Sequence, residues 1–231
     1  PVPGPGQAGV SRDGSSGGTG READADRAEV LRRVRLAVGT QPPGGGVSRD
    51  YRGVGARPAD DPVGLFVERL TDYRASAYRC GADEVGATIA GILGERGRTR
   101  ICVPHGLPAR WSAPGWQVVG GDAPPDPVAL DAFDGVVSGC ALAIALTGTI
   151  VLDSGPGQGW RAVTLVPDYH LVVVRADQIV PAVPDAVARL DATRPMTWIS
   201  GPSATSDIEF DRVEGVHGPR TLDVLVVAEG R

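Results

Sequence analysis

Hydrophobic positions separate a sparse N-terminal part of the chain from a regularly patterned remainder. Residues 1–20 carry small, polar and turn-forming side chains, and this composition predicts a disordered tail. Further along, Leu31, Val34 and Val38 recur at three- and four-residue intervals with arginines between them, which predicts an amphipathic helix. Turn-forming residues follow, so residues 21–58 are predicted to form a helical arm with a flexible linker.

From residue 59 onward, helical spacing alternates with short apolar runs. Helices are predicted over residues 61–73, 83–96 and 184–190. Strands are predicted over residues 101–104, 117–120, 135–139, 170–175, 196–200 and 222–227, with two more joined at Thr147-Gly148. Continuous apolar strands that alternate with helices favour a mostly parallel sheet covered on both faces. We therefore expect an α/β fold, a three-layer α/β/α sandwich over residues 59–231 with an N-terminal helical arm.

The composition excludes several kinds of chemistry. The chain of 231 residues contains no lysine and no asparagine, so all 23 basic residues are arginine. Without lysine there is neither a Schiff base nor a phosphate loop that ends in Gly-Lys. A net charge of −5 with scattered arginines disfavours nucleic acid as a partner. The absence of a long apolar stretch and of an apolar leader predicts a cytoplasmic protein without a membrane span.

Three cysteines, Cys80, Cys102 and Cys140, are widely spaced and form no CxxC pair, which predicts reduced thiols in the core. An iron–sulfur cluster needs four thiolates as a rule, so this chain cannot hold one by itself. A zinc site assembled from the cysteines and the three histidines stays open, although no spacing signature supports it.

Ligands of open α/β sheets sit beyond the carboxyl ends of the strands, where four loops of this chain are predicted. In the first loop, His105 serves either as acid, base or ligand, or as a turn histidine that caps the next helix. In the second, residues 147–149 either present N–H groups to an anion or form a tight turn between strands.

The third loop, residues 153–161, contains three glycines in five positions and is predicted to be mobile and exposed. Arg161 at its end could swing over a carboxylate or phosphate, or the loop could be a long hairpin connection. Further on, Asp168 precedes His170 by two positions. The two side chains could form a pair that orients a general base, or a plain structural hydrogen bond.

The fourth loop follows the strand at residues 196–200 and ends in a capping box at residues 206–209. Its hydroxyl and N–H groups suit an anion, but they would also describe an ordinary helix N-terminus. The polar segment 214–220 precedes the final strand. It is therefore predicted at the opposite end of that strand from the crevice, unless the strand is antiparallel.

The pairing of TGT with a downstream PDYH, followed by SGPSATSDIE and EGVHGPR, closely resembles the lactate utilization protein C family with its LUD domain. The resemblance covers about residues 135–227. It implies a fold similar to the glucosamine-6-phosphate isomerase, ribose-5-phosphate isomerase and CoA-transferase group. It also implies a place beside iron–sulfur subunits that oxidise L-lactate to pyruvate, with the clusters in the partners and no cofactor on this chain alone.

The resemblance marks motif residues as candidates for binding an anion or substrate, without assigning a catalytic residue or a metal ligand. These positions are Thr147, Gly148, Thr149, Arg161, Asp168, His170, Ser200, Gly201, Ser203, Thr205, Asp207, Glu209, His217 and Arg220. One position departs from the family pattern, because Leu146 stands where members often have glutamate. Leucine cannot carry a proton, so the departure favours a binding or assembly role over catalysis.

Three functional interpretations follow. In the first, the chain is a subunit of a lactate-oxidising complex, with a base at His170 or His217 and a carboxylate clamp at Arg161 or Arg220. In the second, it is a stand-alone enzyme of the isomerase or CoA-transferase-like fold that acts on a phosphorylated or CoA-linked small molecule. In the third, it is a non-catalytic scaffold whose first helix docks the iron–sulfur subunits.

Overall fold

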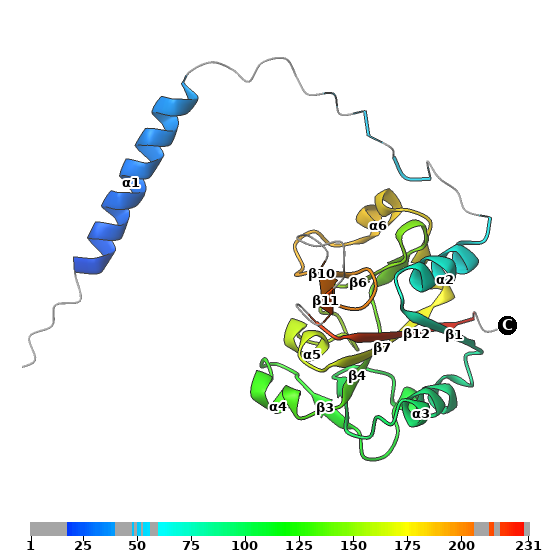
Figure 1. The fold of residues 1–231 in the computed structure, drawn as a ribbon. Coiled ribbons are helices and arrows are strands. Elements are labelled where there is room, and N and C mark those ends of the chain that lie inside the picture. The colour runs from blue at the N-terminus through cyan, green and yellow to red at the C-terminus, as the bar shows by residue number, and fades with distance from the viewer. Residues whose placement is uncertain are drawn as a thin grey trace, which may run out of the picture. The chain divides into compact units, whose positions relative to one another are not determined.

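A computed structural model describes residues 18–39, 48, 50–51, 53–55, 60–205, 213–214 and 218–228, and Figure 1 shows its fold. The chain divides into two units, residues 1–50 and 51–231. The first contains the predicted N-terminal helix, α1 (Gly18–Val38). The tail before residue 18 lies outside the described residues, and the domain boundaries predicted at residues 20 and 58 stay predictions.

The core of the second unit is a sheet of six parallel strands in the order β1-β12-β7-β4-β2-β3 (Figure 1). The strands are β1 (Ser76–Cys80), β2 (Ile101–Pro104), β3 (Gln117–Val119), β4 (Gly135–Ser138), β7 (Tyr169–Arg175) and β12 (Thr221–Val227). β12 pairs with β7 along its whole length, and β1 pairs with the other side of β12, at the edge of the described sheet. The apolar runs of β7 and β12 are buried, as expected for central strands of a parallel sheet.

A second sheet of four strands has the order β8-β5-β6-β9. It contains β5 (Leu142–Ile144), β6 (Thr149–Leu152), β8 (Ile179–Val180) and β9 (Thr197–Ile199), with η2 (Ala145–Thr147) between β5 and β6. β6 runs antiparallel to both β5 and β9. The two strands predicted around Thr147-Gly148 are therefore present, but they belong to this second sheet. A short antiparallel pair, β10 (Ala204–Thr205) and β11 (Val213–Glu214), follows.

Helices cover both faces of the parallel sheet, which confirms the predicted α/β class. On one face, α3 (Val85–Glu95) and η1 (Ala109–Trp111) pack against Leu171 and Val173. On the other, α2 (Pro62–Asp72) and the second sheet pack against Val172 and Val174. The remaining helices are α4 (Pro127–Asp131), α5 (Arg161–Leu165), η3 (Ala176–Gln178) and α6 (Val183–Arg189).

Local sequence explains the start of α2. The carboxylate of Asp61 accepts a hydrogen bond from the N–H of Gly64 at 2.8 Å, and Pro62 occupies the first turn, where no N–H is needed. Phe66 and Leu70 lie one turn apart on the buried side of the helix. The C-terminal half of this helix packs against two of the predicted motifs, at Gly148 and at Gly201.

All three cysteines are free thiols, and Cys102 and Cys140 are buried. Burial raises the pKa of each of these two thiols to about 12, so both are neutral in ordinary buffers. Among the described residues, the structure contains no cluster of histidine, cysteine and acidic side chains that could hold a metal ion. Nor does any helix in that part of the chain have the length and apolar character needed to cross a membrane.

Candidate functional site

A chain of three hydroxyl groups links two motifs that lie far apart in the sequence. The Oγ1 atoms of Thr147 and Thr149 lie 2.7 Å apart, and Thr149 Oγ1 lies 2.8 Å from Ser200 Oγ. β6 and β9 are antiparallel neighbours, so the residue that begins β6 meets the residue that follows β9. The predicted candidates Thr147, Thr149 and Ser200 are therefore brought together, and their hydrogen bonds are made largely to one another.

Close packing against α2 explains the glycines of the same motifs. Gly148 and Gly201 both have left-handed backbone conformations, with φ of 59° and 84°. A Cβ at Gly148 would lie 2.8 Å from Cβ of Arg69, and one at Gly201 would lie 2.9 Å from the carbonyl oxygen of Tyr73. Both glycines are thus required where these turns approach α2.

Residues 200–203, the SGPS loop, border a cavity of about 260 Å³, here named the amino-end cavity. Arg161 and His170 line it, together with Gly218 and Pro219, which directly precede β12. The N–H of Ser203 donates to the carbonyl oxygen of Pro219 at 2.8 Å. The SGPS loop and the segment before β12 therefore meet at one place.

The position of this cavity corrects the sequence-based expectation. The SGPS loop was expected at the carboxyl ends of parallel strands, opposite the segment 214–220. It follows β9, however, which is antiparallel to β6 in the second sheet, and it therefore reaches the amino ends of β7 and β12. Apolar runs in β5, β6 and β9 resemble those of the central strands, so the sequence pattern could not show that they form a separate sheet.

His170 is almost fully buried near the amino end of β7. Its Nε2 shares a hydrogen bond of 2.7 Å with the hydroxyl of Ser138, the last residue of β4. Burial lowers the pKa of His170 to about 3, so the imidazole is neutral over the physiological range. Sequence reasoning missed Ser138, although a serine that ends an otherwise apolar strand was a usable signal.

Asp168 and His170 have different partners, so the structure does not form the proposed Asp–His pair. A carboxylate oxygen of Asp168 accepts a hydrogen bond from Nε of Arg220 at 2.6 Å. Both of these side chains are largely exposed. Thr205 belongs to β10, where it pairs with Val213. The remaining candidates, Asp207, Glu209 and His217, and the predicted capping box lie outside the described residues.

The loop at residues 153–160, predicted to be mobile and exposed, is anchored by hydrogen bonds, and only part of it is exposed, at Ser154, Pro156 and Trp160. The N–H of Gly157 donates to the carbonyl oxygen of His105 at 2.9 Å, and the carbonyl of Gly157 accepts from the N–H of Gly139 at 2.8 Å. Gln158 is buried and donates to Asp153 at 2.8 Å. The first and third predicted loops thus meet at the carboxyl ends of β2 and β4. Arg161 is not part of a swinging loop, because it begins α5.

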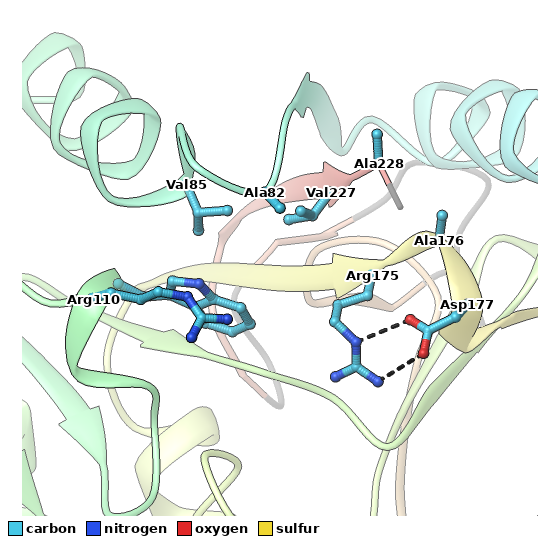
Figure 2. Close-up of a pocket in the computed structure, with 9 residues that line it drawn as sticks. Ala82, Val85, Arg110, Arg175, Ala176, Asp177, Val227 and Ala228 are labelled. Carbon is cyan, nitrogen blue, oxygen red and sulfur yellow. Dashed lines mark hydrogen bonds and ion pairs between the residues drawn. The ribbon is translucent and has the colours of Figure 1, made fainter. Parts of the chain in front are cut away.

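A cleft of about 390 Å³ lies at the carboxyl ends of β1, β7 and β12 (Figure 2). Val85 and Val227 form part of its apolar wall, and Arg110 and Arg175 provide its cationic groups. Arg175 is already occupied, because it forms hydrogen bonds of 2.9 and 3.1 Å to the carboxylate of Asp177. The sequence candidates do not include any residue that lines this cleft.

Comparison with known proteins relates this chain to one family. A model of the LUD domain matches residues 129–227. Lactate utilization protein C of Deinococcus radiodurans is 48% identical over 166 residues, which cover 70% of this chain and 77% of that protein. Lactate utilization protein C of Halalkalibacterium halodurans is 25% identical over 220 residues, which cover 87% of this chain and 94% of that protein.

A solved structure supports the same relationship. The crystal structure of a DUF162 family protein from Deinococcus radiodurans is 41% identical to this chain and matches it with a TM-score of 0.60. The match covers 72% of this chain and 96% of that one.

Proposed function

Because this chain belongs to the lactate utilization protein C family, we propose that it serves lactate utilization as a subunit of an iron–sulfur complex that oxidises L-lactate to pyruvate. Its role in that complex is binding or assembly rather than independent catalysis. The observation that carries the proposal is the 48% identity to a relative named for lactate utilization, over 77% of that relative's length.

The chemistry of lactate oxidation requires an acceptor for two electrons. This chain has three cysteines, one fewer than the four thiolates that a cluster needs as a rule, so we assign the clusters to partner subunits. Partner iron–sulfur subunits would supply the electron transfer, and this chain would supply protein contacts and a site for the substrate anion.

The hydrogen bonding of the motif residues favours binding over catalysis. The hydroxyl groups of Thr147, Thr149 and Ser200 bond to one another, and the neutral imidazole of His170 is buried against Ser138. Leu146, where family members often have glutamate, is half-buried and does not line the amino-end cavity. These groups stabilise the walls of the cavity and leave no exposed base among them.

Arg161 is the group that we assign to the substrate. It is exposed at the amino-end cavity, and within the described part of the chain its guanidinium has no protein partner. A guanidinium can bind a carboxylate through two parallel hydrogen bonds, and the hydroxyl of Ser200 lies on the same cavity. This arrangement suits the carboxylate of a small 2-hydroxy acid.

The first test is anaerobic affinity purification of the tagged chain from its own host, followed by absorbance spectroscopy and identification of partners. We expect brown partners that reduce a dye when lactate is added. A colourless chain without partners would contradict the complex and favour a small-molecule enzyme.

In the purified complex, Arg161→Ala should raise the lactate concentration needed for half-maximal dye reduction by about tenfold or more, as expected for loss of a charge-assisted contact. The matched control is Arg79→Ala, because Arg79 is exposed on the edge strand β1 and lies outside the amino-end cavity. If the Arg161 variant needed the same lactate concentration as the parent, the proposal that Arg161 binds the carboxylate of lactate would be wrong.

A further inference from the structure

A second cavity, of about 700 Å³, opens at the carboxyl ends of β2 and β3. His105 follows β2, Asp122 follows β3, and Trp160 and Arg194 come from the loops after β6 and α6. We name it the carboxyl-end cavity. Its volume lies within the range that small-molecule sites of proteins occupy, roughly 300–1,000 Å³.

The topology of the sheet favours a ligand site at this place. From β2 the chain runs outward to β3, whereas from β4, the other neighbour of β2, it runs in the opposite direction to β7. Loops that leave adjacent strands in opposite directions create a crevice at the carboxyl ends of those strands. Such switch points are where open parallel sheets bind their ligands. Here the loop at residues 153–160 bridges the ends of β2 and β4 through Gly157, and the carboxyl-end cavity opens beside this bridge, with His105 on its wall.

One wall of the cavity is rigid. Gly157 bonds to the residues that follow β2 and β4, which fixes the loop that carries Trp160. The indole Nε1 of Trp160 donates to the carbonyl oxygen of Gly121 at 3.1 Å, and a Cβ at Gly120 would lie 3.3 Å from the indole ring. The ring is thus held by one edge while 41% of the residue remains exposed. A fixed and accessible indole is a stacking surface for a planar ring.

The polar groups of the cavity divide into occupied and available ones. The carboxylate of Asp153 accepts from Gly155 and Gln158 and pairs with Arg194 at 3.2 Å. In contrast, the side chains of Asp122 and His105 have no partner within the described part of the chain. An exposed carboxylate and imidazole are free to bind hydroxyl groups, and the guanidinium of Arg194, 40% exposed, has further N–H groups for an anion.

We propose that the carboxyl-end cavity binds a nucleotide. The base stacks on Trp160, the ribose hydroxyls donate to Asp122, and the phosphate accepts hydrogen bonds from Arg194. The combination of an aromatic surface, a free carboxylate and a guanidinium matches the base, the ribose and the phosphate of a nucleotide. A simple carboxylic acid would contact only the guanidinium. This site shares no lining residue with the amino-end cavity, so each proposal can fail without the other.

The test is calorimetric titration of the full chain with AMP, adenosine, ribose 5-phosphate and inorganic phosphate. We expect AMP to bind one site per chain, with affinity above that of adenosine and of ribose 5-phosphate. Trp160→Leu and Asp122→Asn should each weaken AMP binding by about tenfold or more, because stacking and charge-assisted hydrogen bonds are each worth about that much. Arg194→Ala should reduce the affinity for AMP to that for adenosine.

The chain offers matched controls. Trp198 is 42% exposed, almost the same as Trp160, but lies on β9 away from this cavity, so Trp198→Leu should leave AMP binding unchanged. Asp131→Asn is the control for Asp122→Asn, because it neutralises an exposed carboxylate at the end of α4, outside this cavity. It should also leave AMP binding unchanged. Absence of AMP binding, equal effects of target and control variants, or equal affinity for ribose 5-phosphate and AMP would each overturn the nucleotide site.

Discussion

The guanidinium of Arg96 forms two parallel hydrogen bonds, each of 2.9 Å, to the fully buried carboxylate of Asp223. The hydroxyl of Tyr169 donates to the same carboxylate at 2.8 Å. The three residues come from the C-terminal cap of α3, from β12 and from β7. The pair therefore fastens α3 to the middle of the parallel sheet, and the negative carboxylate raises the pKa of Arg96.

Removing one partner of the Arg96–Asp223 pair should lower the stability of the fold substantially. Asp223→Ala would remove the carboxylate that balances the partly buried guanidinium of Arg96, which would keep only its hydroxyl acceptors such as Ser76, and would leave the buried phenol of Tyr169 without this acceptor. We expect this change to lower the free energy of unfolding by about 3–5 kcal/mol. Urea denaturation measures the change. The control is Asp177→Ala, which removes the exposed partner of Arg175 and should cost less than about 1 kcal/mol. If both variants lost the same free energy of unfolding, the buried Arg96–Asp223 pair would stabilise the fold no more than an exposed ion pair does.

The motif glycine Gly148 should be intolerant of any side chain. Gly148→Ala imposes both a left-handed conformation and a clash with Arg69 of α2, so we expect a larger loss of stability than for conformation alone. Gly97→Ala provides the comparison, because Gly97 has nearly the same φ, 64°, with open space where a Cβ would lie.

Thermal unfolding should place Gly97→Ala about 1 kcal/mol below the parent and Gly148→Ala clearly lower still. If the two variants were equally stable, the approach of α2 would not be the reason for the glycine.

Burial of neutral His170 predicts a dependence of stability on pH. The pKa of His170 is about 3 in the folded chain against an ordinary value of 6.5, so the unfolded chain binds more protons between these pH values. The contribution of this residue is fully present above pH 6.5 and falls as the pH is lowered toward 3. The slope approaches about 1.4 kcal/mol per pH unit within this window.

His170→Gln keeps a hydrogen-bonding group for Ser138 but cannot be protonated. Urea denaturation at several pH values should therefore show a shallower loss of stability for this variant below pH 6.5. Parallel pH profiles for the parent and the variant would show that another group controls the acid response.

The first helix can be tested separately from the second unit. Deletion of residues 1–50 should leave the fold intact, since residues 51–231 form their own compact unit. The N–H of Gly55 donates to Asp185 at 2.9 Å, so a deletion that continues beyond Gly55 would also remove a contact of the second unit.

We expect the shorter chain to keep its melting temperature and to lose only the helical circular dichroism signal of α1, but to lose partners in affinity purification. Val30 and Leu36 of α1 are exposed, which suits a docking helix. Full recovery of partners by the shortened chain would remove the docking role.

The central strands could be predicted from the sequence because strands such as β7 are buried on both faces and appear as continuous apolar runs. β1 was missed because Ser76 and Arg79 interrupt its apolar residues, as befits an edge strand. The second sheet was missed because β5 and β6 are just as apolar as the central strands. A run of buried residues predicts a strand but not its sheet.

The candidate site could also be predicted only in part, because a local pattern identifies residues but not their partners. The sequence singled out Thr149, Ser200 and His170 as members of one motif set, and the structure places Thr149 against Ser200 and places Ser200 and His170 on one cavity, while their role stays a prediction. Their bonding could not be predicted, since the partners of Thr149 and His170 lie 51 and 32 positions away in the chain. The carboxyl-end groups Asp122 and Arg194 stand in ordinary turns and carry no local signal.

The place of β12 has a consequence for how the chain is made. This strand is the last of the described strands along the chain, yet it lies between β1 and β7, and among the described strands it is the one that pairs with β1. During synthesis, β1 emerges early and has no strand to pair with until residues 221–227 leave the ribosome. Pairing of β1 therefore waits until residues 221–227 have been made, and a chain interrupted before residue 221 would leave β1 and α3 without the strand that joins them to the core.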